Sequence, residues 1–190
     1  DCFCYGTLVQ RYGISKNTLR ELVHESPGVL KFLDLKLREN CYQKEIIEKS
    51  LEFADIIRIK EKELLFLKNE FNLKSTGLKE LAYELKVLFN IKIVLVTMGQ
   101  KGVFAFDGSG EFYSDPGYLV KVVDNVGSGV AFSAGFLHKY LNGSSLKESL
   151  CFGNGAGALV ATTEAGTYEF SKKSIAAFMR RSKNRSPDFL

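Results

Sequence analysis

A short glycine-rich segment, Asn125–Val130 (NVGSGV), is the part of this sequence best suited to chemistry. It follows the apolar residues Val122 and Val123 and then Asp124, and it precedes a run of small and aromatic residues. This pattern predicts a strand end, a tight turn and a helix. Such a turn points several backbone N–H groups at one spot, and the helix dipole adds positive potential there. The segment therefore predicts a phosphate site. The alternative is a plain strand-to-helix connection in which glycine only supplies unusual backbone angles.

Other nucleotide motifs are weaker. The sequence contains no Gly-x-x-x-x-Gly-Lys-Ser/Thr loop, and Phe132 stands where a dinucleotide fingerprint starting at Gly127 needs a third Gly or Ala. The run Gly153–Ala158 does contain Gly-x-Gly-x-x-Ala, which would suit an NAD-binding domain. Because it follows a helical stretch and not a strand, close packing between helices is the preferred interpretation. His138 stands alone in a helix and is expected to be an ordinary packed or surface side chain.

Strands and helices alternate along the chain, which predicts an α/β fold with a mostly parallel sheet. The apolar run Ile91–Thr97 predicts a strand covered on both faces. A hairpin is expected around Gly108–Gly110, between strands 103–107 and 111–114. Further strands are expected at 29–35, 55–59 and 118–123, and helices at 15–25, 43–53, 61–69, 76–89, 128–141, 145–162 and 171–181.

The composition suits one ordinary globular domain, with 190 residues, 45% apolar and 25% charged residues. No apolar run approaches the ~20 residues of a membrane helix, and no signal peptide is expected. The four cysteines form no Cys-x-x-Cys pair, so reduced thiols and a cytoplasmic location are expected. The net charge of +4 is spread along the chain, which disfavours a nucleic-acid partner. The start at Asp1 without Met suggests a cut or incomplete N-terminus.

Several segments, in order, resemble the ribokinase-like (PfkB) carbohydrate kinases. Asp124–Val130 resembles the family signature Asp-Thr-x-Gly-Ala-Gly-Asp, and Thr97–Gly102 resembles its Thr-x-Gly-x-x-Gly nucleotide-binding turn. Ala54–Leu64 looks like the strand leading into its Asn-x-x-Glu motif. Tyr5–Arg11 and Leu33–Arg38 look like segments of bacterial fructokinase-type members. Asn154–Gly166 is similar to the family's adenine-side helix and loop. The resemblance covers nearly the whole chain but only the later two-thirds of a typical member.

The resemblance implies transfer of the ATP γ-phosphoryl group to the hydroxyl of a fructose-like sugar. It assigns an anion hole to Gly127, Ser128 and Gly129, and it places Val130 at the position of the catalytic Asp. It also implies contacts to ATP, Mg²⁺ or K⁺. The residues it nominates for the nucleotide are Lys60, Glu63, Thr97, Gly99, Gly102, Asn154 and Gly157, and those near a metal are Glu63, Asp124 and Asn125.

Three positions depart from the family pattern. Val130 cannot accept a proton, and a missing general base typically costs ~10²–10⁴-fold in rate. A gain in core packing is the structural explanation that the sequence leaves open for it. Lys60 stands at the Asn position, where it either contacts phosphate as a point charge or is simply a solvated side chain. Asn125 replaces Thr, a mild change that keeps a polar oxygen.

The predicted fold is therefore a three-layer α/β/α ribokinase-like domain with its N-terminal part missing, the part that carries the lid and most sugar contacts in the family. Residues 1–180 are expected to form its nucleotide-binding portion and 181–190 a frayed basic C-terminal tail. Expected partners are a nucleotide, a small sugar, and a protein segment or second chain that completes the fold, but no membrane. Two functions stay open: an ATP-dependent sugar kinase, and a catalytically inactive relative that binds nucleotide or protein.

Overall fold

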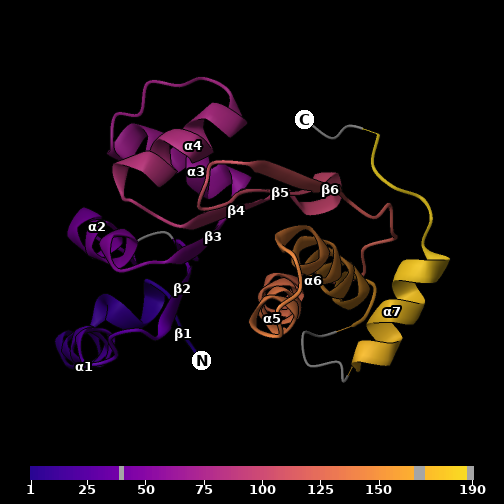
Figure 1. Ribbon diagram of the computed structural model, residues 1–190, viewed down its shortest axis with the longest axis horizontal. Helices are drawn as coiled ribbons and strands as arrows, with labels where there is room; N and C mark the ends of the chain where they lie inside the picture. The colour runs from indigo at the N-terminus through magenta and orange to yellow at the C-terminus, as the bar shows by residue number, and fades with distance from the viewer. Residues whose placement is uncertain (39–40, 165–169, 188–190) are drawn as a thin grey trace. The chain divides into compact units, whose positions relative to one another are not determined.

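The computed structural model describes residues 1–38, 41–164 and 170–187. The chain divides into two compact units (Figure 1). The first comprises residues 1–97 together with 106–111, and the second comprises residues 98–105 together with 112–190.

The first unit contains parallel strands in the order β1-β2-β3-β4, with Asp34 opposite Arg58 and Lys60 opposite Thr97. These pairings bring polar residues near the carboxyl ends of β2, β3 and β4 to one edge of the sheet. The strands are β1 (Cys2–Tyr5), β2 (Leu30–Asp34), β3 (Ile56–Lys60) and β4 (Ile93–Thr97), and the helices are η1 (Leu8–Arg11), α1 (Gly13–His24), α2 (Lys44–Glu52), α3 (Glu61–Glu70) and α4 (Leu78–Leu88).

The core of this unit follows from two periodicities. Successive residues of β3 and β4 are buried, as expected for strands covered on both faces. The helices instead bury one face each, with apolar residues three or four positions apart. Fully buried members of this core are Ile47, Leu51, Ile56, Ile57, Leu64, Leu67, Leu81, Leu85, Val94 and Val96.

The second unit holds a hairpin and three helices. The predicted hairpin is confirmed: Asp107 N–H donates to the Glu111 carbonyl at 3.1 Å, in the turn that joins β5 to β6. The elements are η2 (Gly99–Lys101), β5 (Gly102–Phe106), β6 (Phe112–Pro116), α5 (Ser128–Leu141), α6 (Leu146–Ala161) and α7 (Lys172–Arg181). The hairpin tip, residues 106–111, belongs to the first unit.

Helices α5 and α6 approach each other closely through small residues. A Cβ atom on Gly153 would lie 2.9 Å from the Phe132 carbonyl oxygen, and one on Gly135 would lie 3.0 Å from the Ala156 side chain. The run Gly153–Ala158 lies wholly inside α6. The prediction that this run serves helix packing is confirmed, and the dinucleotide interpretation loses its strand-to-helix context.

Two predictions for the second unit are wrong. Residues 118–123 form no strand, because their backbone groups bind elsewhere: Leu119 N–H donates to the Asn184 carbonyl at 3.0 Å and Val123 N–H to the Ala161 carbonyl at 2.8 Å. The tail is not frayed throughout, since Arg185 forms an ion pair with Asp115 at 2.6 Å. Its guanidinium also lies 3.9 Å from the ring centroid of Tyr118.

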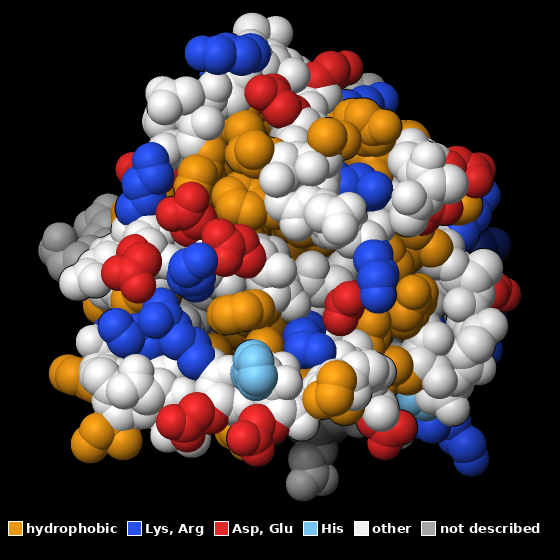
Figure 2. Space-filling model, turned by 60° about the vertical axis from the view of Figure 1, so that its left-hand side comes forward, with side chains coloured by type: hydrophobic (Ala, Val, Ile, Leu, Met, Phe, Trp, Pro, Cys, Tyr) orange, Lys and Arg blue, Asp and Glu red, His pale blue; other side chains and the backbone are white. Residues whose placement is uncertain are grey.

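The surface carries charges of both signs. Figure 2 shows Lys and Arg side chains interspersed with Asp and Glu on the face that it presents, with apolar side chains between them. In the described ranges, no helix has the length and apolar character needed to cross a bilayer. The cysteines Cys2, Cys4, Cys41 and Cys151 are free thiols.

Candidate active site

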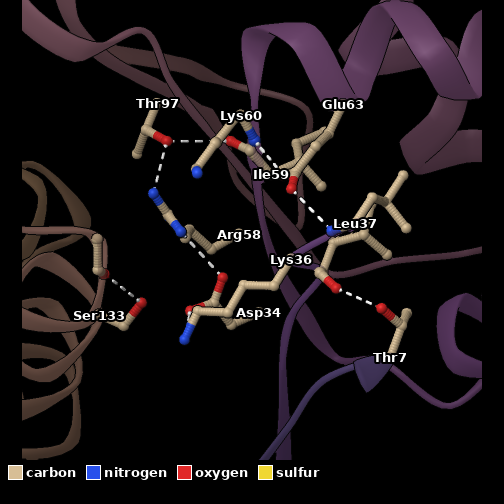
Figure 3. Close-up of polar contacts among 12 residues, drawn as sticks. Thr7, Asp34, Lys36, Leu37, Arg58, Ile59, Lys60, Glu63, Thr97 and Ser133 are labelled. Atoms are coloured by element: carbon tan, nitrogen blue, oxygen red, sulfur yellow. Dashed lines mark hydrogen bonds and ion pairs between the residues drawn. The ribbon is translucent and has the colours of Figure 1, made fainter. Parts of the chain in front are cut away.

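The carboxyl edge of the first unit is held by a charged network centred on Arg58 (Figure 3). Its guanidinium donates to Asp34 Oδ1 at 2.9 Å and to Thr97 Oγ1 at 3.1 Å. Thr97 in turn donates to the Ile59 carbonyl at 3.3 Å, and the Lys36 ammonium lies 3.1 Å from Asp34 Oδ2. The Thr97 hydroxyl hydrogen is therefore committed to the protein, so nucleotide contact by Thr97 stays a prediction.

Arg58 and Asp34 are functional candidates that motif reasoning missed. Arg58 is only 4% exposed, and its Nε atom has no hydrogen-bond partner within the described part of the chain. A charge in an apolar strand (IIRIK) was the available signal, because buried charges are normally paired. An opposite polar residue at a neighbouring strand end, Asp34, was the partner to look for.

Glu63 fastens the start of α3 to the segment after β2. Its Oε2 accepts the Lys60 N–H at 2.8 Å, and its Oε1 accepts the Leu37 N–H at 3.0 Å. Glu63 is buried, whereas Lys60 is exposed at the end of β3. The carboxylate thus fixes the backbone from which the Lys60 side chain projects.

These residues do not fit a Mg²⁺ ion. Both Glu63 oxygens already accept backbone N–H groups, and Asp34 is shared between Arg58 and Lys36. Mg²⁺ prefers oxygen ligands in near-octahedral geometry, but the position of the family's Asn carries the cationic Lys60. Within the described ranges, no three His, Cys, Asp or Glu residues are grouped to hold a metal. The predicted Mg²⁺ contact of Glu63 therefore finds no support in this arrangement.

The glycine turn of the second unit presents backbone donors. Gly127 has φ +82°, in the left-handed region, and is the N-cap of α5. Ser128 N–H donates to the Asn125 carbonyl at 3.3 Å, and Val126 N–H to Asp124 Oδ1 at 2.9 Å. No side chain caps α5, which leaves first-turn N–H groups available to an anion.

Val130 lies in the first turn of α5 and points to solvent. It is 54% exposed, and this turn contains no acidic residue. The exposure excludes core packing as the reason for valine at this position. The structure thus offers no stabilising role for the residue that stands where the family's catalytic Asp is expected.

Asp124 and Asn125 enter the turn but form no cation cage with other acidic residues in the described chain. Asp124 uses Oδ1 to accept the Val126 N–H, and Asn125 is exposed. A K⁺ site near them stays a prediction.

The predicted turn Thr97–Gly102 needs its last glycine for backbone reasons. Gly102 has φ +114°, and a Cβ there would lie 2.5 Å from the Gly117 nitrogen and 2.8 Å from the Pro116 carbonyl carbon. Gly99 has φ +60° with open space around it. Gly102 therefore allows close approach of two backbone segments, whereas contact of Gly99 with nucleotide stays a prediction.

Asn154 and Gly157 both take structural roles in α6. Asn154 Nδ2 donates to Asp115 Oδ2 at 2.5 Å and to the Pro116 carbonyl at 3.0 Å, so its amide hydrogens are committed. A Cβ on Gly157 would lie 3.0 Å from the Ser128 carbonyl oxygen, at the start of α5. Gly157 thus allows α6 to pack closely against the first residue of α5, next to the glycine turn. Contact of either residue with nucleotide stays a prediction.

The carboxylate of Asp115 is the shared acceptor for three side chains of the second unit. It accepts hydrogen bonds from Asn154, Arg185 and the Cys151 thiol, the last at 3.2 Å. Burial, together with the Asp115 charge, raises the pKa of Cys151 to about 12. The thiol is therefore protonated at neutral pH and is not a nucleophile.

Comparison with known proteins decides the family. Residues 24–173 match the pfkB family carbohydrate kinase profile. The chain belongs to the pfkB family. Among its relatives, a fructokinase of Vibrio alginolyticus is 32% identical over 151 residues, which is 73% of this chain and 46% of that protein. The probable chloroplastic fructokinase-6 of Arabidopsis thaliana is 37% identical over 118 residues, covering 57% of this chain and 29% of that protein. The chain spans less than half the length of these curated relatives.

Solved structures confirm the ribokinase-like fold of this pfkB chain. Fructokinase of Xylella fastidiosa with bound ATP gives a TM-score of 0.83 at 18% identity, covering 96% of this chain and 62% of that one. Fructokinase of Vibrio cholerae O395 with fructose, ADP and calcium gives 0.78 at 20% identity, covering 95% and 60%. The predicted α/β class with a mostly parallel sheet is confirmed.

Proposed function

We propose that this chain is the nucleotide-binding portion of a fructokinase-like sugar kinase, and that it binds ATP at the glycine turn with phosphoryl transfer slowed by the loss of its general base. Membership of the pfkB family supports the sugar-kinase class. The uncapped start of α5 supports the phosphate site. A small sugar as acceptor, K⁺ near Asp124, and a segment or second chain that completes the fold are parts of the same proposal.

The turn suits phosphoryl transfer because that reaction depends on positioning and charge stabilisation more than on covalent chemistry. Gly127 and Gly129 would contribute donors, and Ser128 would share the N–H that it also gives to the Asn125 carbonyl at 3.3 Å. The dipole of α5 favours negative charge at the same place. Backbone donors survive most substitutions, so phosphate binding does not need the missing Asp. Removal of the proton from the acceptor hydroxyl does need it.

The exposure of Val130 is the observation that carries this proposal. Val130 lies in the first turn of α5 and is open to solvent, so a carboxylate at this position could reach an acceptor hydroxyl and take its proton. Valine there is also a poorer helix former than many alternatives and gains nothing from the dipole. The proposal therefore keeps phosphate binding at the turn and leaves the chain without a proton acceptor.

The test is to restore the carboxylate. We expect Val130→Asp to raise the rate of ADP formation from ATP, with fructose or with water as acceptor, by about 10²–10⁴-fold. Val126→Asp is the matched control: Val126 is 65% exposed and lies in the same turn, but outside the helix. It adds the same charge nearby but outside the helix, so it should not raise the rate.

Calorimetric titration with ATP separates the two parts of the proposal. If all three forms bind ATP but Val130→Asp gains no rate, the missing-base explanation is wrong. If none of them binds ATP, the proposed nucleotide-binding function is wrong.

One observation favours the second candidate, a catalytically inactive binding module. Val123, Val126 and Val130 are all exposed around the glycine turn, where a working kinase needs polar groups. Exposed valines close together in sequence suit contact with a protein more than with a sugar. This candidate predicts that ATP binds to wild type and that neither Asp variant turns it over.

A further inference from the structure

Helices α3 and α4 end in the same way. Each is followed by a Phe-Asn-aliphatic sequence, Phe71–Leu73 and Phe89–Ile91, in which the Asn lies in the left-handed region at φ +53° and +52°. In both, the N–H of the aliphatic residue donates to a carbonyl five residues earlier, at 2.9 and 3.0 Å, which is the Schellman arrangement. The two phenyl rings meet edge to face with their centroids 5.0 Å apart, so the two helix ends lie side by side.

An open groove of about 520 Å³ lies between these helix ends and α2. Its α2 wall carries Lys44, Glu48 and Glu52, which are spaced four residues apart and therefore share one face of the helix, with about 6 Å between neighbours along the axis. The groove belongs entirely to the first unit. The residues that face α2 across it include Phe71, Leu88 and Phe89.

One ammonium group is already bound in this groove, at the end of α3. Lys44 Nζ donates to the Glu70 carbonyl at 2.6 Å and lies 5.4 Å from the centroid of the Phe71 ring. Both contacts are favourable, because the carbonyl end of a helix dipole and the face of an aromatic ring each stabilise a cation. The end of α3 therefore shows which chemistry this type of helix end accepts: a primary ammonium group on an aliphatic chain.

The end of α4 offers the same two contacts to a ligand. The Leu88 carbonyl and the Phe89 ring are the counterparts of Glu70 and Phe71. Within the ranges that the structure describes, no side chain donates to the Leu88 carbonyl and no cation lies over the Phe89 ring. Leu88 is 55% exposed, so a ligand can reach this end of the helix from solvent.

The chain's own lysine at the end of α4 is not suited to fill this place. Lys86 lies in the last turn of α4, as Lys68 does in α3. Side chains on a helix lean toward its N-terminus, so a lysine in the last turn points away from the final carbonyl groups. At the end of α3, the ammonium over Phe71 accordingly comes from Lys44 of another helix and not from Lys68.

The α2 wall adds a carboxylate for a second cation. Glu52 forms an ion pair with Lys49 at 2.7 Å, whereas Glu48 forms no hydrogen bond or ion pair in the described part of the chain. The hydrogen bond to Glu52 and the charges of Glu52 and Glu48 raise the pKa of Lys49. Lys44 and Lys49 are thus bound to other groups, and Glu48 stays available to a ligand.

We propose that this groove binds a linear aliphatic diamine, with one ammonium group on the Leu88 carbonyl and the Phe89 ring and the other at Glu48. The phenyl rings and Leu88 offer apolar surface to the methylene groups between the two ammonium groups, which a hydrated metal ion would not use. The inference goes beyond the proposed kinase function and does not depend on nucleotide binding.

The experiment is an amide NMR titration of the full chain with 1,4-diaminobutane at constant ionic strength. Four forms are compared: wild type, Glu48→Gln, Phe89→Leu and Glu21→Gln. Glu21→Gln is the matched control, because Glu21 is an exposed glutamate of the same unit but lies on α1. Thermal unfolding of each form shows whether it is folded. Two further probes are 1,4-butanediol, which has the same carbon chain without charge, and N-acetyl-lysine methylamide, which has one ammonium group.

For wild type, we expect the N–H signals of Phe89, Asn90 and Ile91 to shift with 1,4-diaminobutane and to saturate. Glu48→Gln should weaken this binding by about two- to fivefold, the size of one exposed ion pair. Phe89→Leu should weaken it by about the same factor, because the cation–π contact is lost. Glu21→Gln should bind as wild type, and both further probes should bind more weakly than the diamine.

Three results overturn the inference. Equal binding of 1,4-butanediol shows that the groove recognises only an aliphatic chain. Equal binding of N-acetyl-lysine methylamide shows that one ammonium group is enough, as on a lysine of a partner protein, and that Glu48 receives no second one. Shifts that do not saturate, or equal weakening by Glu21→Gln and Glu48→Gln, show general attraction between opposite charges. None of these results affects the ATP titrations, so the proposed function is judged separately.

Discussion

The carboxyl edge of the first unit and the glycine turn of the second hold their polar groups in opposite ways. At the edge, side chains bind one another: Arg58 joins Asp34 to Thr97, and Glu63 bridges two backbone N–H groups. At the turn, the backbone supplies the donors, and no side chain caps them. This difference predicts which property a substitution should change in each region. At the edge, most changes should cost stability, with Lys60 as the exception; at the turn they should cost ligand binding.

The largest expected effect on stability is at the buried ion pair. Asp34→Ala leaves the nearly buried Arg58 guanidinium without its carboxylate, which should lower the free energy of unfolding by about 3–5 kcal/mol. Urea denaturation followed by circular dichroism measures it. The double variant Asp34→Ala/Arg58→Met removes both charges and should regain part of the loss. If Asp34→Ala costs less than about 1 kcal/mol, the edge is not a stabilising network.

Two glycines with the same backbone conformation allow the effect of a substitution on ATP binding to be separated from its effect on stability. Gly127 and Gly143 have nearly the same backbone strain, with φ +82° and +81°, and they flank the two ends of α5. Alanine at either position should cost about 1–2 kcal/mol of stability because L residues disfavour this region. Only Gly127→Ala should also weaken ATP binding, since only there does the backbone face the anion. Equal ATP affinity of the two variants would refute the assignment of the turn.

The smallest expected effect is a pH dependence in the first unit. Burial alone would raise the pKa of Asp55, but hydrogen bonds from the Lys92 ammonium and the Lys31 N–H outweigh it and hold this pKa below its ordinary value of 3.8. A lowered pKa stabilises the folded state above pH 3.8, and this contribution is lost as the pH falls through the lower folded value.

Asp55→Asn should therefore cost about 1 kcal/mol at pH 7, and the difference from wild type should shrink as the pH falls below 3.8. Denaturation curves of both proteins at pH 7 and pH 3 measure it. A difference that stays constant across this range would show that the Asp55 charge contributes nothing.

Most of the fold was predictable from the sequence, from the apolar pattern in the strands and from the small residues in the helices. The nearly continuous apolar run at Ile91–Thr97 indicated a strand covered on both faces, and small residues in α6 indicated close helix packing. The strand expected at 118–123 failed because its N–H groups bind Asn184 and Ala161. Those partners lie about 40 to 65 residues away in sequence, so no local pattern could show them. The first strand, Cys2–Tyr5, is too short to have its own signal.

The part of the candidate site that depends on backbone geometry was predictable from the sequence. The part that depends on pairing between side chains was not. The glycine spacing located the start of α5 correctly. Asn154 and Glu63 were nominated by motif position, yet their hydrogen bonds to Asp115 and to Leu37 belong to the scaffold. The importance of Asp34 depends on its register opposite Arg58, which only the folded sheet reveals.

The most direct test of the account is an amide NMR titration of the full chain with ATP. The account predicts that the N–H signals of Gly127, Ser128, Gly129 and Val130 shift together and saturate, because a phosphate group binds at the start of α5. The signal of Gly143, at the far end of that helix, should not move. Saturable ATP binding that leaves the four turn signals in place would contradict the central claim that this turn is the phosphate site.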